Sequence, residues 1–442
     1  MTELSGFPFF EVEFDKKGAV DDPQQAQAVV DFVASGEVTD LFVFSHGWNN
    51  DLAEARELYG NLCLQLKERR GAGSGGGLPG RKLAVLGVFW PSKKFADKEL
   101  IPSGAASADG GLRDRDLEEQ LAELEGVFDA EDESGRLLEA KDLIPDLEDR
   151  ASARRQFVDL LRGALGGVES LDEEIREELP DPFFDLDGSD LLKKFGQATV
   201  GASLAAGGGA AGVSASPGGA AGLGGFFGGV RAGARNFLNY LTYYQMKKRA
   251  GVVARAGVHE TLAQIRDSSP EVKLHLVGHS FGGRLVAAAA KGPEGASAIV
   301  LDSLTLLQAA FSHNGFSQKF DGENDGFFRL VVTDRRVKGP ILVSHTKNDK
   351  AVGIAYPLAS RIAGQQAAGL GDEKDPFGGI GRNGAQKTPE ALDEALLEVS
   401  GNYSFQAGKI HNLQADDHIS SHSDIAKAEV AHAILEAVAT VG

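Results

Sequence analysis

The chain has almost no cysteine, fewer basic than acidic residues, and no apolar run among its first six residues. Its 442 residues include one cysteine, Cys63, which excludes an internal disulfide and any metal site built from several thiolates. The 45 lysines and arginines are outnumbered by 64 aspartates and glutamates, and the formal net charge of −19 repels nucleic-acid phosphates. Residues 1–6 carry neither the basic cluster nor the apolar run of a secretory signal. We therefore expect a cytoplasmic protein that does not bind nucleic acid.

Apolar residues and glycine are abundant. Hydrophobic residues make up 42% and charged residues 25% of the chain, a balance typical of a folded protein with a large core. The 57 glycines are about 13% of the chain, against an average near 7%. Much of this excess lies between residues 196 and 234, where glycine and alanine dominate. This tract and the acidic segment before it separate three zones: residues 1–95, 96–250 and 251–442.

The first and third zones alternate between apolar runs and helix-forming segments. The expected strands are 9–14, 41–44, 83–90, 272–277, 298–301, 341–344 and 409–413. The expected helices run from a cap at Asn50 or Asp51 to about Arg69, from 254 to 266 and from 424 to 438. Alternating strands and helices are typical of a parallel sheet. The predicted fold class is therefore α/β, with a mostly parallel central sheet flanked by helices.

The middle zone, residues 96–250, has the composition of a large, mainly helical insertion. Its segment from Leu112 to Leu179 is acidic and rich in helix formers, and the glycine–alanine tract 196–234 follows. An insertion at this point can cover the mouth of a site, so we expect a lid or cap. Residues 197–230 are uncharged over a length that could span a bilayer. A membrane-touching hairpin and a disordered linker are therefore the alternatives for the tract.

The sharpest chemical signal is the sequence Gly-His-Ser-Phe-Gly at 278–282. It lies directly after an apolar strand and before an alanine-rich helix. G-x-S-x-G in this context is typical of a nucleophile elbow, a turn so tight that glycine is needed on both sides of the serine. The turn lifts the hydroxyl clear of the sheet, over the N-terminus of the next helix. We therefore predict that Ser280 is a nucleophile.

A serine nucleophile needs a base and a carboxylate that orients the base. In enzymes with this elbow, the acid and then the histidine follow the serine along the chain. Asp349 follows an expected strand at its carboxyl end, where catalytic groups collect in parallel sheets, and Asp302 is the alternative because it would end the preceding strand. The predicted base is His422, in the loop before the last helix, with His418 of the same loop as the alternative.

The oxyanion formed during acyl transfer needs two preorganised N–H donors. The elbow presents the backbone N–H of Phe281 beside the serine, which makes it the first donor. We expect the second from Trp48, because Gly47 lets the loop after strand 41–44 approach the substrate. The residues expected to line the substrate site are His46, Gly47, His279 and Trp90.

These motifs together resemble the α/β-hydrolase superfamily of serine esterases and lipases. The matching stretches are SHGWNN at 45–50, FWPS at 89–92 and LHLVGHSFGGRL at 274–285. They look most like bacterial α/β-hydrolases of uncharacterised function that carry HGFNN-like, WPS and GHSxG motifs, although Trp48 stands where phenylalanine is commoner. The resemblance spans about residues 1–95 and 250–442. It implies an α/β-hydrolase fold in which Ser280, Asp349 and His422 form the triad and Trp48 and Phe281 the oxyanion hole.

The predicted function is hydrolysis of carboxylic esters through a Ser-His-Asp triad and an acyl-enzyme, without a metal or organic cofactor. The large insertion favours a lipase-like enzyme over an esterase for small esters. Thioesters and amides are alternative substrates, because the same triad can cleave them. The alternative from another class is a non-catalytic binding or membrane-associated protein, in which 196–234 contacts the membrane. The expected partner is a small-molecule or lipid ester, and the sequence does not specify an oligomeric state.

Overall fold

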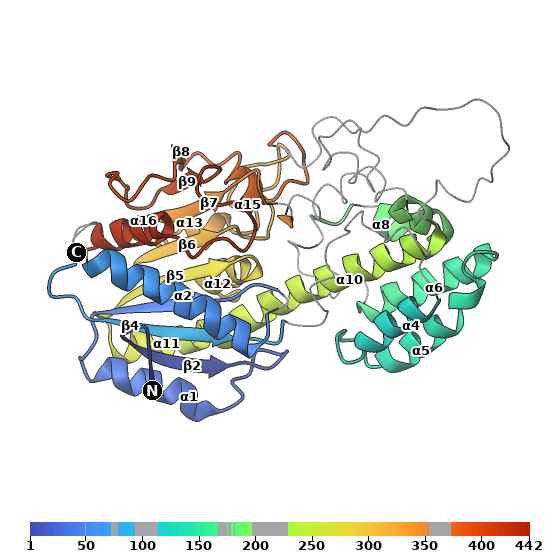
Figure 1. The fold of residues 1–442 in the computed structure, drawn as a ribbon, viewed down its shortest axis with the longest axis horizontal. Helices are drawn as coiled ribbons and strands as arrows, with labels where there is room; N and C mark the ends of the chain where they lie inside the picture. The colour runs from blue at the N-terminus through green and yellow to red at the C-terminus, as the bar shows by residue number, and fades with distance from the viewer. Residues whose placement is uncertain are drawn as a thin grey trace. The chain divides into compact units, whose positions relative to one another are not determined.

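The computed structural model describes most of the chain (Figure 1). The described residues are 1–48, 50–71, 78–92, 114–166, 175, 178–180, 182–196, 229–349, 351–352 and 373–442. The chain divides into two compact units. The first consists of Met1–Lys93, Met246–Tyr356 and Gly371–Gly442, and the second of Lys94–Gln245 and Pro357–Leu370.

The first unit is built on one sheet. Among the described residues, nine strands pair in the order β1-β2-β4-β3-β5-β6-β7-β9-β8, and all neighbours are parallel except β1 and β2. The strands are β1 Thr2–Leu4, β2 Phe7–Glu13, β3 Asp40–Ser45, β4 Leu83–Phe89, β5 Lys273–His279, β6 Ser303–Leu307, β7 Ile341–His345, β8 Ala391–Ala395 and β9 Ile410–Gln414. The predicted α/β class with a mostly parallel central sheet is thus confirmed.

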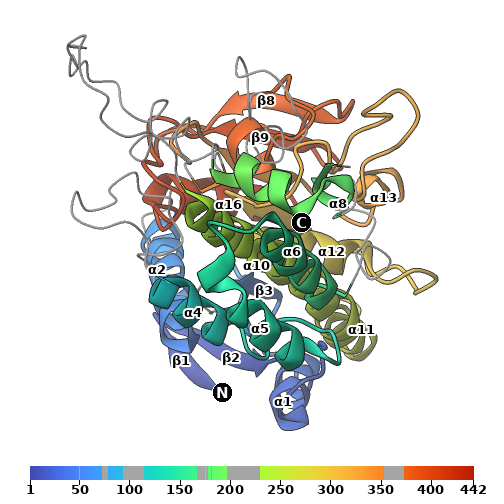
Figure 2. The same cartoon turned by 90° about the vertical axis from the view of Figure 1, so that its right-hand side faces the viewer.

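Helices cover both faces of this sheet (Figure 2). Helices α2 (Leu52–Gly71) and α16 (Ala428–Ala439) pack against each other and share one apolar core with the inward side chains of the strands. The opposite face carries α1 (Pro23–Ala34), α11 (His259–Ser268) and α12 (Phe281–Lys291), with the π-helical turn η3 (Ala254–Val258) beside α11 and α12. All residues of β3 and β4 are buried, as expected for strands covered on both faces.

Shorter helices complete the described part of this unit. Helices α13 (Arg329–Thr333) and α15 (Ile380–Asn383) lie in the connections after β6 and β7.

Asp51 caps α2, because its side chain accepts hydrogen bonds from the N–H groups of Ala53 and Glu54, both at 2.9 Å. Glu54 in turn accepts from the Asp51 N–H at 2.7 Å, which completes a capping box.

The described residues of the second unit form helices. They are α4 (Asp114–Glu123), α5 (Glu133–Asp142), η1 (Ile144–Asp146), α6 (Ala151–Ala164), α8 (Pro182–Asp185) and the first part of α10 (Val230–Val253). Aromatic side chains fill its core, with the Phe183 ring 6.0 Å from that of Phe237 and 5.6 Å from that of Tyr240.

Most of the glycine–alanine tract, residues 197–228, lies outside the described residues. The lid, the membrane-touching hairpin and the linker assigned to 196–234 therefore stay predictions. Within the described part of the chain, no helix combines the length and the apolar character needed to cross a membrane.

The structure corrects two sequence predictions in the third zone and adds one strand. Residues 298–301 do not form a strand, since Leu301 makes only an isolated bridge and Val300 is 43% exposed; the strand β6 begins at Ser303. The closing helix begins at Ala428 instead of residue 424, because Asp424 accepts hydrogen bonds from Ser420 and stabilises a loop there. The strand β8 was not predicted.

Candidate active site

The strand order brings the loops after β3 and β5 together. β3 and β5 are neighbours, but the chain continues from β3 to β4 on one side and from β5 to β6 on the other. In open α/β sheets, ligands bind at the carboxyl ends of the strands where two neighbouring connections leave in opposite directions. The loop that contains Gly47 and the turn that contains Ser280 flank this point.

The turn at Ser280 has the geometry of a nucleophile elbow. Ser280 has φ 56° and ψ −124°, in a region that side chains rarely adopt, and α12 begins at the next residue. A Cβ at Gly278 would overlap the carbonyl oxygen of Gly282, and one at Gly282 would overlap that of Ser45. Both glycines are therefore required by close backbone contacts. For Gly278 the contact lies within the turn, as the sequence predicted, whereas Gly282 is required by the approach of the end of β3.

Asp349 and His422 form a hydrogen-bonded pair. The Nδ1 atom of His422 lies 2.8 Å from Oδ2 of Asp349, and this carboxylate is completely buried. Its other oxygen accepts a hydrogen bond from the N–H of Val352 at 2.9 Å. A carboxylate held in this way fixes the tautomer and orientation of an imidazole.

His422 lies beside the elbow. Its ring centroid is 4.8 Å from that of His279, the residue before Ser280. No hydrogen bond joins Ser280 Oγ to His422 among the contacts of these two described residues. Hydrogen bonds between a nucleophile and its base are often long before substrate binds, so this geometry is compatible with proton transfer.

Gln308 supports the carboxylate, and the sequence analysis did not identify it. The side-chain amide of Gln308 is oriented with its nitrogen toward two acceptors and its oxygen toward a hydroxyl group. The nitrogen donates to Asp349 Oδ2 at 3.1 Å and to the carbonyl of Gly381 at 2.7 Å, and the oxygen accepts from Ser344 Oγ at 3.2 Å. Gln308 directly follows β6 and has φ 47°. Its position at the end of a strand between β5 and β7 is the one signal that could have singled it out.

The loop after β3 closely approaches the nucleophile. A Cβ at Gly47 would lie 2.7 Å from Ser280 Cβ and 3.2 Å from Ser280 Oγ. The ring of Trp48 lies 5.9 Å from that of Phe281. The two residues predicted as oxyanion donors therefore lie on neighbouring segments that flank Ser280.

His46 and Trp90, predicted to line the substrate site, hold this loop to the end of β4. The indole Nε1 of Trp90 donates to the His46 carbonyl at 3.1 Å, and the Trp90 backbone N–H donates to His46 Nε2 at 3.3 Å. The rings stack with centroids 5.5 Å apart, and both side chains are buried. Burial lowers the pKa of His46 to about 4, so its imidazole is neutral at pH 7.

Asp302 lies at the wrong end of β6 to serve as the acid. It precedes the strand instead of ending it, and its carboxylate accepts from the backbone N–H of Leu274 at 2.9 Å. It also forms ion pairs with Arg266 at 3.4 Å and Lys338 at 2.8 Å. These contacts are at the amino ends of the parallel strands, whereas Asp349 and His422 follow carboxyl ends. The prediction that Asp302 ends a strand is therefore wrong.

His418, the alternative base, does not pair with Asp349. It lies instead with Glu398 and Glu429, and one potential ligand atom from each of the three falls within 4.8 Å of the others. Histidine nitrogens and carboxylate oxygens are both ligands that Zn²⁺ accepts. No other group of described residues brings three such atoms this close.

A second Ser-His-Asp chain lies at the amino ends of the strands. His275 Nε2 is 2.9 Å from Asp40, and His275 Nδ1 is 2.8 Å from Ser303 Oγ. Burial raises the pKa of Asp40, but hydrogen bonds from His275 and Arg81 outweigh it and hold the pKa below its usual range. All three members are at most 3% exposed, so substrate cannot reach them.

No protein-family model, curated protein or solved structure matches this chain.

Proposed function

We propose that the chain is a serine hydrolase of the α/β-hydrolase fold that cleaves carboxylic esters. The observation that carries the proposal is the hydrogen-bonded Asp349–His422 pair beside the strained elbow at Ser280. The three residue types follow the carboxyl ends of β5, β7 and β9, and their order along the chain is serine, acid, histidine. A buried carboxylate paired with a histidine, next to a strained serine, is typical of enzymes that catalyse acyl transfer.

In this mechanism, Ser280 attacks the acyl carbon while His422 takes the hydroxyl proton. The protonated imidazole then gives that proton to the leaving alcohol, and the C–O bond of the ester breaks. Asp349 keeps the proton of Nδ1 in place and stabilises the imidazolium. Water, activated by His422, attacks the acyl-enzyme and releases the acid and free Ser280.

The N–H groups of Trp48 and Phe281 are the proposed donors to the oxyanion. Phe281 is the first residue of α12, whose N-terminus favours negative charge. Gly47 allows the loop of Trp48 to lie against Ser280. Donors fixed before the reaction stabilise the developing charge without reorganisation, and one such donor typically contributes about 3 kcal/mol to the transition state.

The test is hydrolysis of p-nitrophenyl esters of increasing acyl length by the wild type and by Ser280→Ala. Removal of the nucleophile should lower kcat by about 10⁴-fold or more. The control is Ser303→Ala, which removes the serine of the second, buried Ser-His-Asp chain and should keep the wild-type rate. Equal rates in wild type and Ser280→Ala would refute the proposal. If thioesters or amides are cleaved faster than esters, the mechanism would stand but the substrate class would change.

A further inference from the structure

His279 has its own contact with the proposed base. This side chain is 6% exposed, and its Nε2 lies 2.9 Å from the backbone carbonyl oxygen of His422. A carbonyl oxygen can only accept, so Nε2 carries the hydrogen and Nδ1 carries the lone pair. His279 thus contacts His422 twice, through this hydrogen bond and through the packing of the two rings.

The His279 imidazole stays neutral throughout the working pH range. Burial, and secondly the neighbouring His422, lower its pKa to about 3. Its Nδ1 is buried without a hydrogen-bond partner among the described residues, beside Gly47. A buried polar atom without a partner lowers stability, and an apolar side chain would avoid this loss. What the imidazole adds at this position is therefore the Nε2–H donor.

We propose that His279 is a positioning residue, whose Nε2–H holds the backbone of His422 so that the His422 imidazole stays within reach of Ser280. Its catalytic consequence rests on the proposed function. Asp349 holds one nitrogen of the His422 ring. Other hydrogen bonds hold neighbouring parts of the loop between β9 and α16, from Asn348 to the Ile419 carbonyl at 2.9 Å and from Ser420 to Asp424, whereas the His279 bond holds the backbone of His422 itself. His279 ends β5 and adjoins the nucleophile, so it ties the base to the strand that carries Ser280.

Two substitutions separate the donor from the rest of the side chain. In His279→Gln the amide nitrogen can reach the position of Nε2, whereas in His279→Asn it reaches only the position of Nδ1. With the donor lost, we expect His279→Asn to lower kcat about 100-fold with little change in KM, because a misplacement of about 1 Å can cost that much. His279→Gln should recover most of the rate.

The second readout is the low-field proton NMR signal of His422 Nδ1–H, assigned by its loss in Asp349→Asn. This signal reports the pairing with Asp349 without turnover. We expect it to broaden and move upfield in His279→Asn but to stay in place in His279→Gln. If the wild type hydrolyses no ester, the proposed function fails, but the NMR comparison still decides the role of His279.

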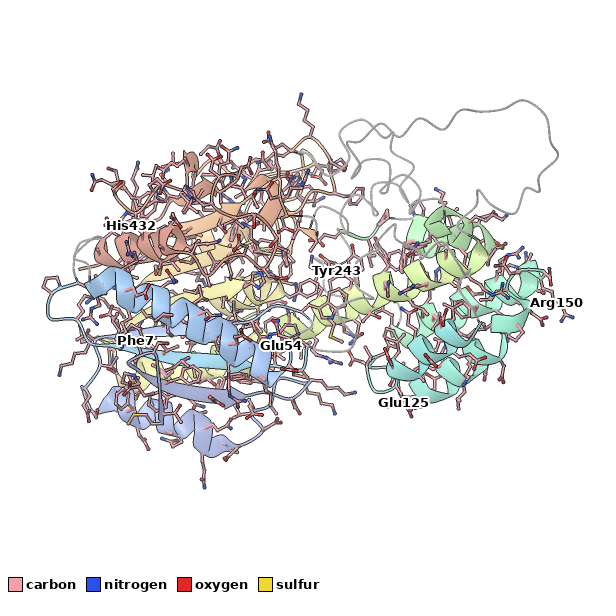
Figure 3. The ribbon with its side chains drawn as sticks, viewed as in Figure 1. Phe7, Glu54, Glu125, Arg150, Tyr243 and His432 are labelled. Carbon is pink, nitrogen blue, oxygen red and sulfur yellow. The ribbon has the colours of Figure 1, made fainter. Side chains whose placement is uncertain are left out.

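His432 provides a matched control (Figure 3). It lies on α16, is 2% exposed, donates from Nε2 to the carbonyl of Gly401 at 2.7 Å, and has a buried Nδ1 without a partner among the described residues. His432→Asn should lower stability but leave kcat and the low-field signal unchanged. Three outcomes would overturn the proposal. They are a wild-type kcat and low-field signal in His279→Asn, a loss of both kcat and the low-field signal in His279→Gln, or a wild type that shows no low-field signal.

Discussion

Gly47→Ala is the most direct test of the contact between the β3 loop and the nucleophile. Gly47 does not have a positive φ, so alanine is sterically allowed by the backbone itself. The new methyl group would lie 2.7 Å from Ser280 Cβ, about 1 Å closer than the ordinary carbon–carbon contact of about 3.5–4.0 Å. Either the loop or the elbow must therefore move by about 1 Å.

A shift of this size displaces the proposed Trp48 donor relative to Ser280. Misplacement by about 1 Å or loss of one oxyanion donor each costs about 100-fold or more. We expect kcat/KM for p-nitrophenyl esters to fall about 100-fold in Gly47→Ala, mainly through kcat, while the far-ultraviolet circular dichroism stays that of the wild type.

The control for this experiment is Gly60→Ala, in the middle of α2. Its Cβ would make only an ordinary contact, 3.5 Å from Leu4. Alanine is favoured over glycine in a helix by about 1 kcal/mol, so this variant should melt at a higher temperature with unchanged kcat/KM. A folded Gly47→Ala variant with wild-type kcat/KM would refute the reasoning, because the loop would then be free to move without consequence.

Two further predictions concern the support of the acid and the response to pH. Gln308→Leu removes a hydrogen bond to the Asp349 carboxylate and should lower kcat/KM about tenfold, and an unchanged steady-state rate would contradict this role. Burial lowers the pKa of both His46 and His313 to about 4, whereas unfolded histidine titrates near 6.5. The unfolded chain therefore binds more protons between these pH values, so acid lowers the free energy of unfolding, by up to about 3 kcal/mol per pH unit for the two groups. Urea unfolding at pH 7, 6 and 5 measures this slope. Equal free energies of unfolding at all three pH values would contradict the inference that His46 and His313 are buried as neutral imidazoles.

The sequence predicted the parts of the fold that have a strong local pattern. The runs that became β3 and β4 are wholly apolar and wholly buried, and Gly278 of the elbow is imposed by a contact with Gly282, four residues away. Gly282, in contrast, is imposed by the carbonyl of Ser45 at the end of β3, a contact that no local pattern shows. β8 was missed because its sequence, ALDEA, is short, acidic and only partly buried at the edge of the sheet. The strand predicted at 298–301 was placed too early in the sequence, because its apolar residues precede the sheet. Ser303–Leu307, which has two hydroxyl side chains, forms β6 instead.

The contacts that complete the candidate site could not be predicted, because they join distant parts of the chain. His279 and His422 are 143 residues apart, and their hydrogen bond depends on how β5, β7 and β9 pair in space. Gln308 reaches Asp349 only because β6 and β7 are neighbours. Residue type and order along the chain identified Ser280, Asp349 and His422 as candidates and already favoured His422 over His418. The contact between His422 and Asp349 that supports this choice is visible only in the fold.

The two Ser-His-Asp chains of this protein show that residue types alone do not define a candidate active site. Asp40, His275 and Ser303 are joined by hydrogen bonds of 2.9 and 2.8 Å, close to the 2.8 Å of the Asp349–His422 pair, but they lie near the amino ends of β3, β5 and β6. Arg81 pairs with Asp40 and donates to the carbonyl of Val438 at 2.9 Å, so it links this end of the sheet to α16. At the carboxyl edge, in contrast, the side chain of His422 is 19% exposed on a loop, and the serine hydroxyl stands over the N-terminus of a helix. Ser280 is itself only 6% exposed, but its proposed base lies on a partly exposed loop and the N-terminus of α12 favours the developing anion. Neither feature is found around Ser303 among the described residues, which is why we propose Ser280 as the nucleophile.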